Sequence, residues 1–422
     1  MATIAAIALI GCSGAISEPA QTGAASISDG PNTSAAASET TTPTTVTTLP
    51  PVNICSSVGD QPSRGQLLGE VDGFAKQAQT TGAGLGGQLY VVTSTADSGP
   101  GTLRDGLEQG GRWVVFDKLA FPVDRETVIT VDSPIQIGGD STLDGRCANV
   151  RIAATKKSDG ALFIGYYADS GVNNVMITTV KIGPVPGQTN DDQSGDGLRI
   201  VWGSDRFYVA HVEIFSAHDE ALEIDRGDRG PMRGTIANSV IRDTAKAVLV
   251  GDGTDNNEKQ GGWQTNAHRI EVTFHDNWFN RNQVRNPVVI DATVHLFNNF
   301  ISSYGLVGDV SASAGQEFGG NAWVWTEGNV IEPRAGGIPC GIAVINYGSL
   351  GVTGTTYVTA NDNVYRDGSK FCSFRKADPP APDKVPYDYK LADPGPNGMQ
   401  LTDRLTNADL TDKARAGWVQ LR

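Results

Sequence analysis

Short runs of apolar and β-branched residues recur along most of the chain, separated by polar residues and glycines. Between residues 195 and 300 these runs read GDGLRI, DEALEI, KAVLVG, HRIEVTFHDNWFN, VRNPVV and TVHLFNNF, and most of them end at Asn or Gly. Each run is long enough for one strand, and a long helical period is absent. Strands that recur at one-coil intervals predict a solenoid, in which successive coils stack their strands in register.

The segment that precedes these runs predicts the start of the solenoid. SGPGTLRDGLEQ combines turn residues with a short helix, for which Thr102 is the expected N-cap and Asp105 lies in the first turn. The runs RWVVFD, TVITVD, IQIGG and NVRIA follow, each broken by Gly, Asp or Pro. We therefore expect a short N-terminal capping helix and then the first coils.

Asparagines close several of the strands, and we interpret them as structural residues. They are Asn238, Asn277, Asn298, Asn329 and Asn363. Stacked Asn side chains inside a solenoid turn can hydrogen-bond to the neighbouring backbone and to one another. His295, which lies close to the pair of Asn298 and Asn299, is assigned a structural role for the same reason.

The two ends of the chain differ in composition from the solenoid. Beyond Asp367 the Pro-rich stretch KADPPAPDKVPYDYKLADPGP predicts an irregular segment that wraps back over the solenoid's side. Residues 13–57 are rich in Ser, Thr, Ala and Pro and cannot bury a core, so we expect a disordered tether there. The predicted organisation is a signal-like segment at 1–12, the tether at 13–57 and one solenoid domain at 58–422.

The first twelve residues, MATIAAIALIGC, are too short to span a bilayer and resemble the apolar region of an export signal. LIGC, which ends at Cys12, resembles a bacterial lipobox, in which the Cys carries a lipid anchor. No Lys or Arg precedes the apolar run, and an ordinary cleaved signal is the alternative. We therefore expect an exported protein, either secreted or lipid-anchored at the cell surface.

Four further cysteines are consistent with export. They are Cys55, Cys147, Cys340 and Cys372. An even number of cysteines in an exported chain predicts two disulfides. Pairing Cys55 with Cys147 and Cys340 with Cys372 is the least tangled arrangement, although the sequence leaves the pairing open.

The overall charge limits the choice of partner. The formal net charge is −14 over 422 residues, which argues against nucleic acid. An acidic protein can hold an acidic polymer only through local Lys, Arg or metal charge. Five isolated charges on the recurring strands supply such a set, namely Asp196, Asp219, Glu223, Lys246 and Arg285. In a solenoid, charges at matching places on successive coils line up on one outer face.

Each of these charges also has an ordinary structural explanation. Asp219 and Glu223 could form surface ion pairs with Arg226 or Arg229, which contribute little to stability. Lys246 could discourage pairing at a sheet edge, and Arg285 could bridge two coils. The functional interpretation rests on the whole set in its order along the chain.

The ordered motifs resemble a known family. GGQLYVVTSTADSGPGTLRDGLEQGGRWVVFD, IQIGGDSTLDG, GDGLRI, DEALEI, KAVLVG, VTFHDNWF, VRNPVV and VHLFNN occur in the order found in family 1 polysaccharide lyases. The chain resembles the pectate lyases of that family, to which pectin lyases are related, over residues 82–299. The resemblance implies a right-handed parallel β-helix that uses Ca²⁺ to cleave polygalacturonate by β-elimination.

The resemblance also implies roles for the charged residues. Asp196, Asp219 and Glu223 correspond to the carboxylates that hold Ca²⁺, and an even spacing places Asp219 and Glu223 on one strand face. Lys246 corresponds to the residue that binds the substrate carboxylate, and Arg285 to the catalytic Arg. Ca²⁺ suits this set because it prefers oxygen ligands and tolerates irregular geometry.

Two positions depart from the family pattern. Ser194 stands where a further carboxylate is common, so Asp192 is an alternative ligand. Ile290 stands where pectate lyases usually carry a second Arg, which pectin lyases also lack.

We therefore predict a monomeric, calcium-dependent pectate lyase that forms 4,5-unsaturated oligogalacturonides. The alternatives are a pectin lyase-like activity on methyl-esterified pectin and a β-helix that binds polysaccharide without cleaving it.

Overall fold

A computed structural model describes residues 58–165, 171–225, 230–251, 269–305, 314–345, 354–373, 381 and 384–406. These residues fall within one compact unit, Asn53–Arg422. The predicted signal-like segment and most of the chain assigned to the tether precede this unit, and residues 1–57 lie outside the described part. Among the described residues, no helix is long and apolar enough to cross a lipid bilayer.

The strands form three parallel sheets. Sheet A contains β1 (Gln88–Val92), β2 (Arg112–Phe116), β5 (Ser141–Asp144), β8 (Val175–Thr178), β11 (Phe207–Ala210), β14 (Met232–Ala237), β17 (Ile270–His275), β20 (Thr293–Phe297), β23 (Trp323–Glu327) and β26 (Tyr357–Asn361). Sheet B contains β3 (Thr127–Val131), β6 (Val150–Ala154), β9 (Lys181–Ile182), β12 (Glu213–Phe215), β15 (Val240–Arg242), β18 (Trp278–Asn280), β21 (Phe300–Tyr304), β24 (Val330–Pro333) and β27 (Val364–Tyr365). Sheet C contains β4 (Ile135–Gln136), β7 (Gly160–Ile164), β10 (Asp196–Ile200), β13 (Glu220–Ile224), β16 (Lys246–Val250), β19 (Val288–Ile290), β22 (Gln316–Gly319), β25 (Cys340–Ile345) and β28 (Lys370–Ser373).

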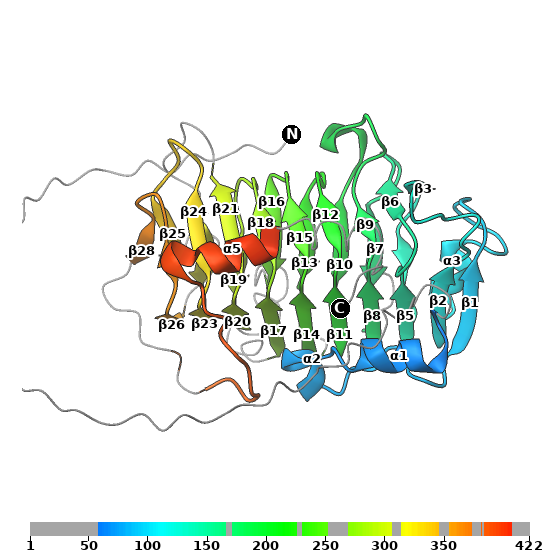
Figure 1. Cartoon of the computed structure of the whole chain (residues 1–422), viewed down its shortest axis with the longest axis horizontal. Helices are drawn as coiled ribbons and strands as arrows, with labels where there is room; N and C mark the ends of the chain where they lie inside the picture. The colour runs from blue at the N-terminus through cyan, green and yellow to red at the C-terminus, as the bar shows by residue number, and fades with distance from the viewer. Residues whose placement is uncertain are drawn as a thin grey trace, which may run out of the picture. The chain divides into compact units, whose positions relative to one another are not determined.

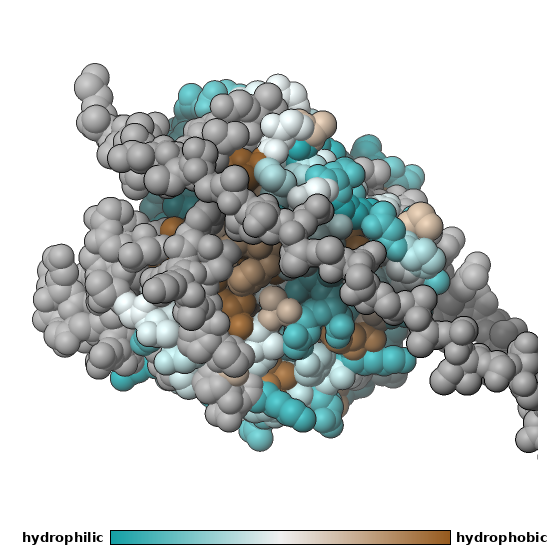
Figure 2. All heavy atoms as spheres, turned by 90° about the vertical axis from the view of Figure 1, so that its left-hand side faces the viewer, coloured by the Kyte–Doolittle hydropathy of each residue, from teal (hydrophilic) through white to brown (hydrophobic). Residues whose placement is uncertain are grey.

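The chain visits sheet A, sheet B and sheet C in turn and then returns to sheet A one coil further on, as β14, β15, β16 and β17 illustrate (Figure 1). Connections between parallel strands of one sheet are right-handed because strands twist that way. The fold is therefore a right-handed parallel β-helix, which confirms the predicted solenoid. Figure 2 looks onto the end at which β28 lies, where apolar side chains gather in the middle of the face and polar side chains surround them.

The interior is filled by rows of aliphatic side chains that run along the solenoid. In sheet C, Leu162, Leu198, Leu222 and Val248 occupy equivalent positions on four successive strands, and none of them is exposed. Burying one such side chain contributes about 1.5–3 kcal/mol. Because every coil repeats these contacts, the strand positions are fixed and the outward side chains between them keep a constant spacing.

Short helices precede and follow most of the coils along the chain. They are α1 (Gln61–Leu68), α2 (Gly73–Gln77), α3 (Leu103–Glu108), α5 (Met399–Thr406) and the 3-10 turn η6 (Pro396–Gly398), while a further 3-10 turn, η2 (Asn190–Asp192), lies between β9 and β10. The predicted capping helix is α3, and Thr102 Oγ1 accepts a hydrogen bond from the Asp105 backbone N–H at 3.2 Å. The sequence analysis did not predict α1, α2 or α5.

An asparagine ladder runs along the turns between sheets A and B. The Asn277 backbone N–H donates to Asn299 Oδ1 at 3.0 Å, and Asn299 and Asn329 repeat the contact with the next coil. The prediction of structural asparagines is correct in kind, but at Asn238 and Asn298 the next residue, Ser239 or Asn299, takes the ladder position. The Asn298 side chain instead bonds to the backbone of the C-terminal segment, at Lys390 and Ala392.

The C-terminal segment wraps over the outside of the solenoid, as predicted. Tyr387 donates or accepts hydrogen bonds with Thr273 and His295 on sheet A, at 2.7 and 2.8 Å between the polar atoms. Further along, α5 places Leu401 and Leu405 against Phe300 of sheet B and its neighbours. His295 is therefore buried between a strand and the wrap, in the structural role expected for it.

The cysteines differ in part from the predicted pairing. Cys340 and Cys372 lie on the adjacent strands β25 and β28 as free thiols. The two cysteines are not opposite each other in the strand register: Cys340 aligns with Lys370, and Cys372 aligns with Ala343. Cys147 is disulfide-bonded, and its predicted partner Cys55 lies outside the described residues.

A buried histidine connects the two ends of the described chain to the coils. His275 contacts Asp276 at 2.8 Å and Asp72 beside α2 at 3.0 Å, and Asp276 pairs with Arg404 of α5 at 2.5 Å. Burial opposes the charge on the His275 imidazole, but the hydrogen bonds with Asp276 and Asp72 outweigh it and raise the pKa to about 9. The histidine therefore remains protonated at neutral pH.

We expect this ion pair to make folding stability fall in mildly alkaline solution. A raised pKa stabilises the folded state below the unfolded value of 6.5, and the contribution is lost as the pH rises to about 9. The loss amounts to at most about 3 kcal/mol. Melting temperatures measured between pH 6 and pH 10 should fall less for His275→Gln than for the parent chain. Parallel pH profiles for the two proteins would contradict this assignment.

Candidate active site

A group of charged side chains lies on the outer face of sheet C, where three consecutive strands begin. Asp196, Glu220 and Lys246 are the first residues of β10, β13 and β16. Glu220 aligns with Lys246 in register, and the pairing of Leu198 with Leu222 brings Asp196 level with Glu220. The stacking of the coils therefore places residues that are far apart in sequence side by side.

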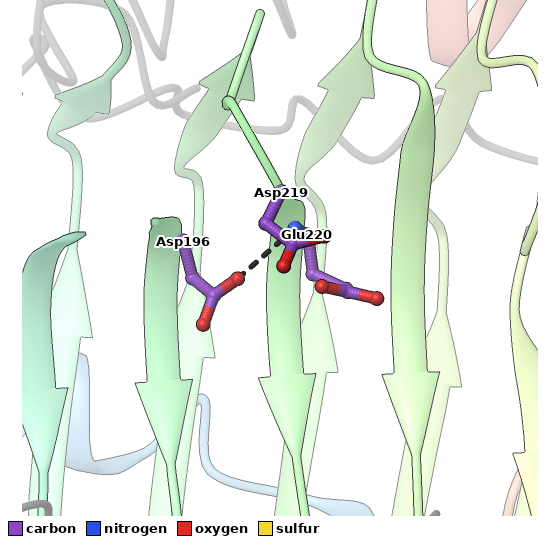
Figure 3. A group of neighbouring side chains, drawn as sticks. All are labelled: Asp196, Asp219 and Glu220. Carbon is purple, nitrogen blue, oxygen red and sulfur yellow. Dashed lines mark hydrogen bonds between the residues drawn. The ribbon is translucent and has the colours of Figure 1, made fainter. Parts of the chain in front are cut away.

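Three carboxylates converge within this group, as Figure 3 shows. Asp219 lies in the turn just before β13, next to Glu220, while Asp196 approaches from the neighbouring strand. One oxygen from each of the three lies within 4.8 Å of the others, close enough to share a metal ion. The Glu220 backbone N–H donates to Asp196 Oδ1 at 3.0 Å, which fixes the Asp196 carboxylate beside β13.

Glu220 was not among the predicted residues, whereas the predicted Glu223 contacts Asp196 but is not one of the three converging carboxylates. Asp219 precedes the strand, so the even spacing to Glu223 does not put the two on one strand face. Ala221 and Leu222 both belong to the core, which breaks the alternation and leaves Glu220 and Glu223 on the outside. Glu223 then lies outside the group of three carboxylates that could share an ion.

Arg199 binds Glu223 and was also missed by the sequence analysis. Its guanidinium lies 2.5 Å from Glu223 Oε2 and 2.7 Å from Asp196 Oδ2, and it covers the Phe163 ring at 5.4 Å from the ring centroid. Burial opposes the charge on Arg199, but Asp196 and Glu223 outweigh it and raise its pKa. A permanent positive charge therefore stands beside the carboxylates, contributed by the R of GDGLRI.

The two predicted cations reach the same carboxylates. Lys246 binds Asp219, and its Nζ lies 3.7 Å from Glu220. Arg285 binds Glu220 through Nη1, and its carbonyl oxygen accepts a hydrogen bond from the Val248 N–H at 2.8 Å. Both side chains remain about one third exposed, at 38% for Lys246 and 31% for Arg285. They are open to a ligand approaching from solvent.

The carboxylates are crowded enough to disturb one another's ionisation. Burial and then the charge of Glu223 raise the pKa of Asp196. Burial and then the hydrogen bond with Asp219 raise the pKa of Glu220 to about 7. Such shifts arise where carboxylates are buried and lie close to one another. A hard divalent cation, which prefers carboxylate oxygens, fits this donor set of Asp196, Asp219 and Glu220.

The positions that depart from the family pattern lie close to this group. Asp192 bonds to the Thr189 backbone N–H at 2.9 Å within a local turn and is not one of the three converging carboxylates. Ile290 packs with Leu249 and Val288 in an apolar cluster on the same sheet. Leu249 aligns in register with Glu223 on one neighbouring strand and with Val288 on the other. The outward-facing residues of sheet C therefore change from charged to apolar at this position. Arg226 and Arg229, considered above as partners of Asp219 and Glu223, lie outside the described residues.

Comparisons with known proteins agree with this architecture. A family model for pectate lyases matches residues 131–338, a range that contains all five predicted site residues. A probable pectate lyase C from Emericella nidulans is 25% identical over 311 residues, which cover 68% of this chain and 65% of that protein. A pectate lyase from Lilium longiflorum is 28% identical over 253 residues, which cover 56% of this chain and 52% of that protein. The matches therefore span half to just under two thirds of these relatives' own length.

Solved structures share the fold. The crystal structure of jun a 1, the major allergen from cedar pollen, superposes with a TM-score of 0.61 at 21% identity, covering 87% of this chain and 99% of the allergen. At that level of identity, the likeness establishes the parallel β-helix and not the chemistry.

Proposed function

We propose that this chain, which belongs to the pectate lyase family, is a calcium-dependent lyase that cleaves polygalacturonate by β-elimination. The observation that carries the proposal is the convergence of three carboxylates with Lys246 and Arg285 on one face of sheet C. A β-elimination on a uronic acid polymer needs a positive centre for the sugar carboxylate and a base for the adjacent proton. The products would be oligogalacturonides with a 4,5-double bond.

Ca²⁺ would be held by Asp196, Asp219 and Glu220. When bound, it would neutralise negative charge that develops on the substrate carboxylate as the neighbouring proton leaves. Glu223, the third ligand implied by the family resemblance, is engaged by Arg199 and would support the ligands from one position further out. The three carboxylates provide only part of a calcium shell, so water and substrate oxygens would supply the remainder.

Lys246 and Arg285 would act directly on the sugar. Lys246 offers an ammonium group for the substrate carboxylate. Arg285 would take the proton from C5, and the electron pair of that bond would form the C4–C5 double bond. The bond from C4 to the glycosidic oxygen would break, and the departing oxygen would take a proton from solvent.

An arginine acts as a base only when its neutral form is accessible, because its pKa is normally very high. In the structure Arg285 forms an ion pair with Glu220. A cation held by Glu220 would weaken this ion pair and bring a second positive charge close to the guanidinium. Glu220 would therefore link the proposed metal site to the proposed base.

Ultraviolet absorbance of the unsaturated uronate tests this proposal. With polygalacturonate and Ca²⁺ we expect absorbance to rise steadily, and we expect a chelator in excess to abolish the rise. Restoring Ca²⁺ should restore the rate, which controls for damage by the chelator. Full activity on polygalacturonate in the presence of chelator would refute the calcium assignment.

A second candidate is a pectin lyase-like activity on methyl-esterified pectin. Two observations favour it: Arg199 already brings a positive charge to the carboxylates, and Ile290 belongs to an apolar cluster beside them. Methyl esters need less positive charge than carboxylates and tolerate apolar surroundings. Cleavage of highly esterified pectin at an equal rate with and without chelator would favour this candidate over the first.

The third candidate is a β-helix that binds polysaccharide without cleaving it. The presence of both Lys246 and Arg285 beside the carboxylates argues for chemistry instead. Binding of polygalacturonate with no absorbance change under any condition would support this candidate.

We further propose that the protein is exported and acts as a monomer, with a lipid anchor on Cys12 as one route to the cell surface. The motif LIGC and the Ser/Thr-rich tether support this compartment. Fractionation of producing cells would test export, and mass analysis of the N-terminal peptide would test the lipid anchor. A protein found only in the cytoplasm would contradict export.

A further inference from the structure

A cavity of about 710 Å³ lies on the outer side of sheet A, near its last strands. Its walls come from β23, from β26 and from the part of the C-terminal wrap that runs past them, residues 384–389, here called the strap (Figure 1). The volume is in the range of small-molecule sites. The carboxylate group belongs to sheet C, so this cavity is separate from the candidate active site.

A buried carboxylate organises the cavity. Glu327 accepts a hydrogen bond from the Tyr389 hydroxyl at 2.5 Å and from Asn361 Nδ2 at 3.2 Å, and His295 Nε2 lies 3.4 Å from it. The hydrogen bond with His295, followed by those from Tyr389 and Asn361, holds the pKa of Glu327 below its usual range against the effect of burial. The ionised Glu327 therefore fixes both an aromatic ring and an amide at the wall.

Tyr389 combines fixed orientation with exposure. The residue is 40% exposed although its hydroxyl is held, and its ring packs edge-on against His295 at 4.5 Å between centroids. Tyr387 is fixed in the same way by Thr273 and His295. Trp325 adds a third aromatic ring to the lining. Aromatic groups that are already ordered lose little entropy when a ligand stacks on them.

The lining chemistry fits a sugar ring. A pyranose has apolar C–H faces that stack on aromatic rings and hydroxyl groups around its edge that need donors and acceptors. Asn361, Thr359 and Lys384 supply such groups beside the aromatic rings. A few convergent polar groups among aromatic side chains is the usual composition of a small-molecule site.

The charge of the lining selects among sugars. The lining contains two carboxylates, Glu327 and Asp388, and one ammonium group, Lys384. An acidic polymer would be repelled here, and a neutral saccharide would not. We propose that this cavity binds a short neutral oligosaccharide, in a second binding site distinct from the carboxylate group. Binding itself is independent of the proposed lyase activity; only its use, to hold neutral parts of a polysaccharide near the active site, rests on that function.

Titration calorimetry on the full chain tests the proposal. The probes are galactohexaose and cellohexaose, both neutral and β-1,4-linked, with trigalacturonate as the acidic comparison. We expect at least one neutral probe to bind, and we expect Tyr389→Ala and Asn361→Ala each to weaken it at least about tenfold. Tyr389→Phe keeps the ring and should retain more affinity than Tyr389→Ala.

The controls separate this site from the active site. Asp219→Asn alters the carboxylate group and should leave neutral-sugar binding unchanged, while melting curves establish that each variant is folded. Failure of both neutral probes to bind, or unchanged binding in the folded Asn361→Ala and Tyr389→Ala variants, would overturn the proposal. Neutral-sugar binding in a protein that shows no lyase activity would sustain it while removing the proposed function.

Discussion

Replacing Arg285 with lysine is expected to lower kcat on polygalacturonate by about 10²–10⁴-fold, the usual contribution of general-base catalysis, while KM changes little. Lysine keeps a positive charge near Glu220, which Arg285 contacts in the structure, so the electrostatic balance of the site is largely retained. It loses the planar guanidinium and its reach. The change therefore removes the proposed base without removing a cation.

The ratio of kcat to KM effects decides what Arg285 does. If the residue only anchors substrate, KM should rise and kcat should remain near the parent value. Arg281→Lys is a matched control, because Arg281 is only four residues away but pairs with Asp243 at 2.6 Å and not with the carboxylate group. A near-native kcat for Arg285→Lys would place the base elsewhere. An equal loss in both variants would point to a general effect on the fold.

The sequence alone was sufficient to predict the architecture and to select residues for a candidate site, for a physical reason. A solenoid stacks equivalent positions of successive coils, so charges at the starts of consecutive strands, such as Asp196 on β10 and Lys246 on β16 with β13 between them, gather at one place on the sheet. Their proximity follows from the repeat and does not depend on details of packing. The stacked asparagines and the Thr102 cap follow from equally local rules.

Details that depend on a single residue of register could not be predicted in this way. Glu220 faces outward because Ala221 and Leu222 both turn into the core, and a period of two residues does not anticipate such a break. The ladder contains Asn299 and not Asn298 for a similar reason, since one residue decides which amide enters the turn. Only the three-dimensional structure shows which residue faces outward and which asparagine enters the ladder.

Contacts between distant segments were also beyond the sequence pattern. Arg199 follows Asp196 by three residues, but its second partner, Glu223, comes from the next coil. The choice of Glu223 as a partner of Arg199 depends on which side chains of the two coils point outward at the same level. That choice depends on the break in alternation at Ala221 and Leu222. The strap likewise meets sheet A through Tyr387, whereas its sequence predicted a wrap over the solenoid's side without indicating which sheet it covers.

The division of roles between Glu220 and Glu223 leads to a prediction on metal affinity. Calorimetric titration with Ca²⁺ should show clearly weaker affinity for Glu220→Gln, because a ligand oxygen loses its charge. Altering a residue that only supports the ligands costs about 10- to 100-fold in metal affinity, so the loss of a ligand charge should cost at least that much. Glu223→Gln should weaken binding less, since Arg199 already neutralises that carboxylate. The reverse order would restore Glu223 as the third ligand.

In the same titration Arg199→Met should raise calcium affinity, whereas Glu220→Gln should lower it. Removing the unit positive charge that contacts Asp196 should relieve on the order of 1 kcal/mol of repulsion toward a divalent ion even at the dielectric constant of water, so calcium affinity should rise by up to about tenfold. Without calcium the variant should melt at a lower temperature, because Asp196 and Glu223 lose their shared partner while they remain buried. Added calcium should recover much of that loss by binding the folded state.

Arg233→Met, which breaks the ion pair between Arg233 of sheet A and Asp205, is the control and should lower stability with no change in calcium affinity. If Arg199→Met binds calcium no better than the parent chain, Arg199 does not compete with the metal for these carboxylates, and its positive charge serves the substrate or the fold instead.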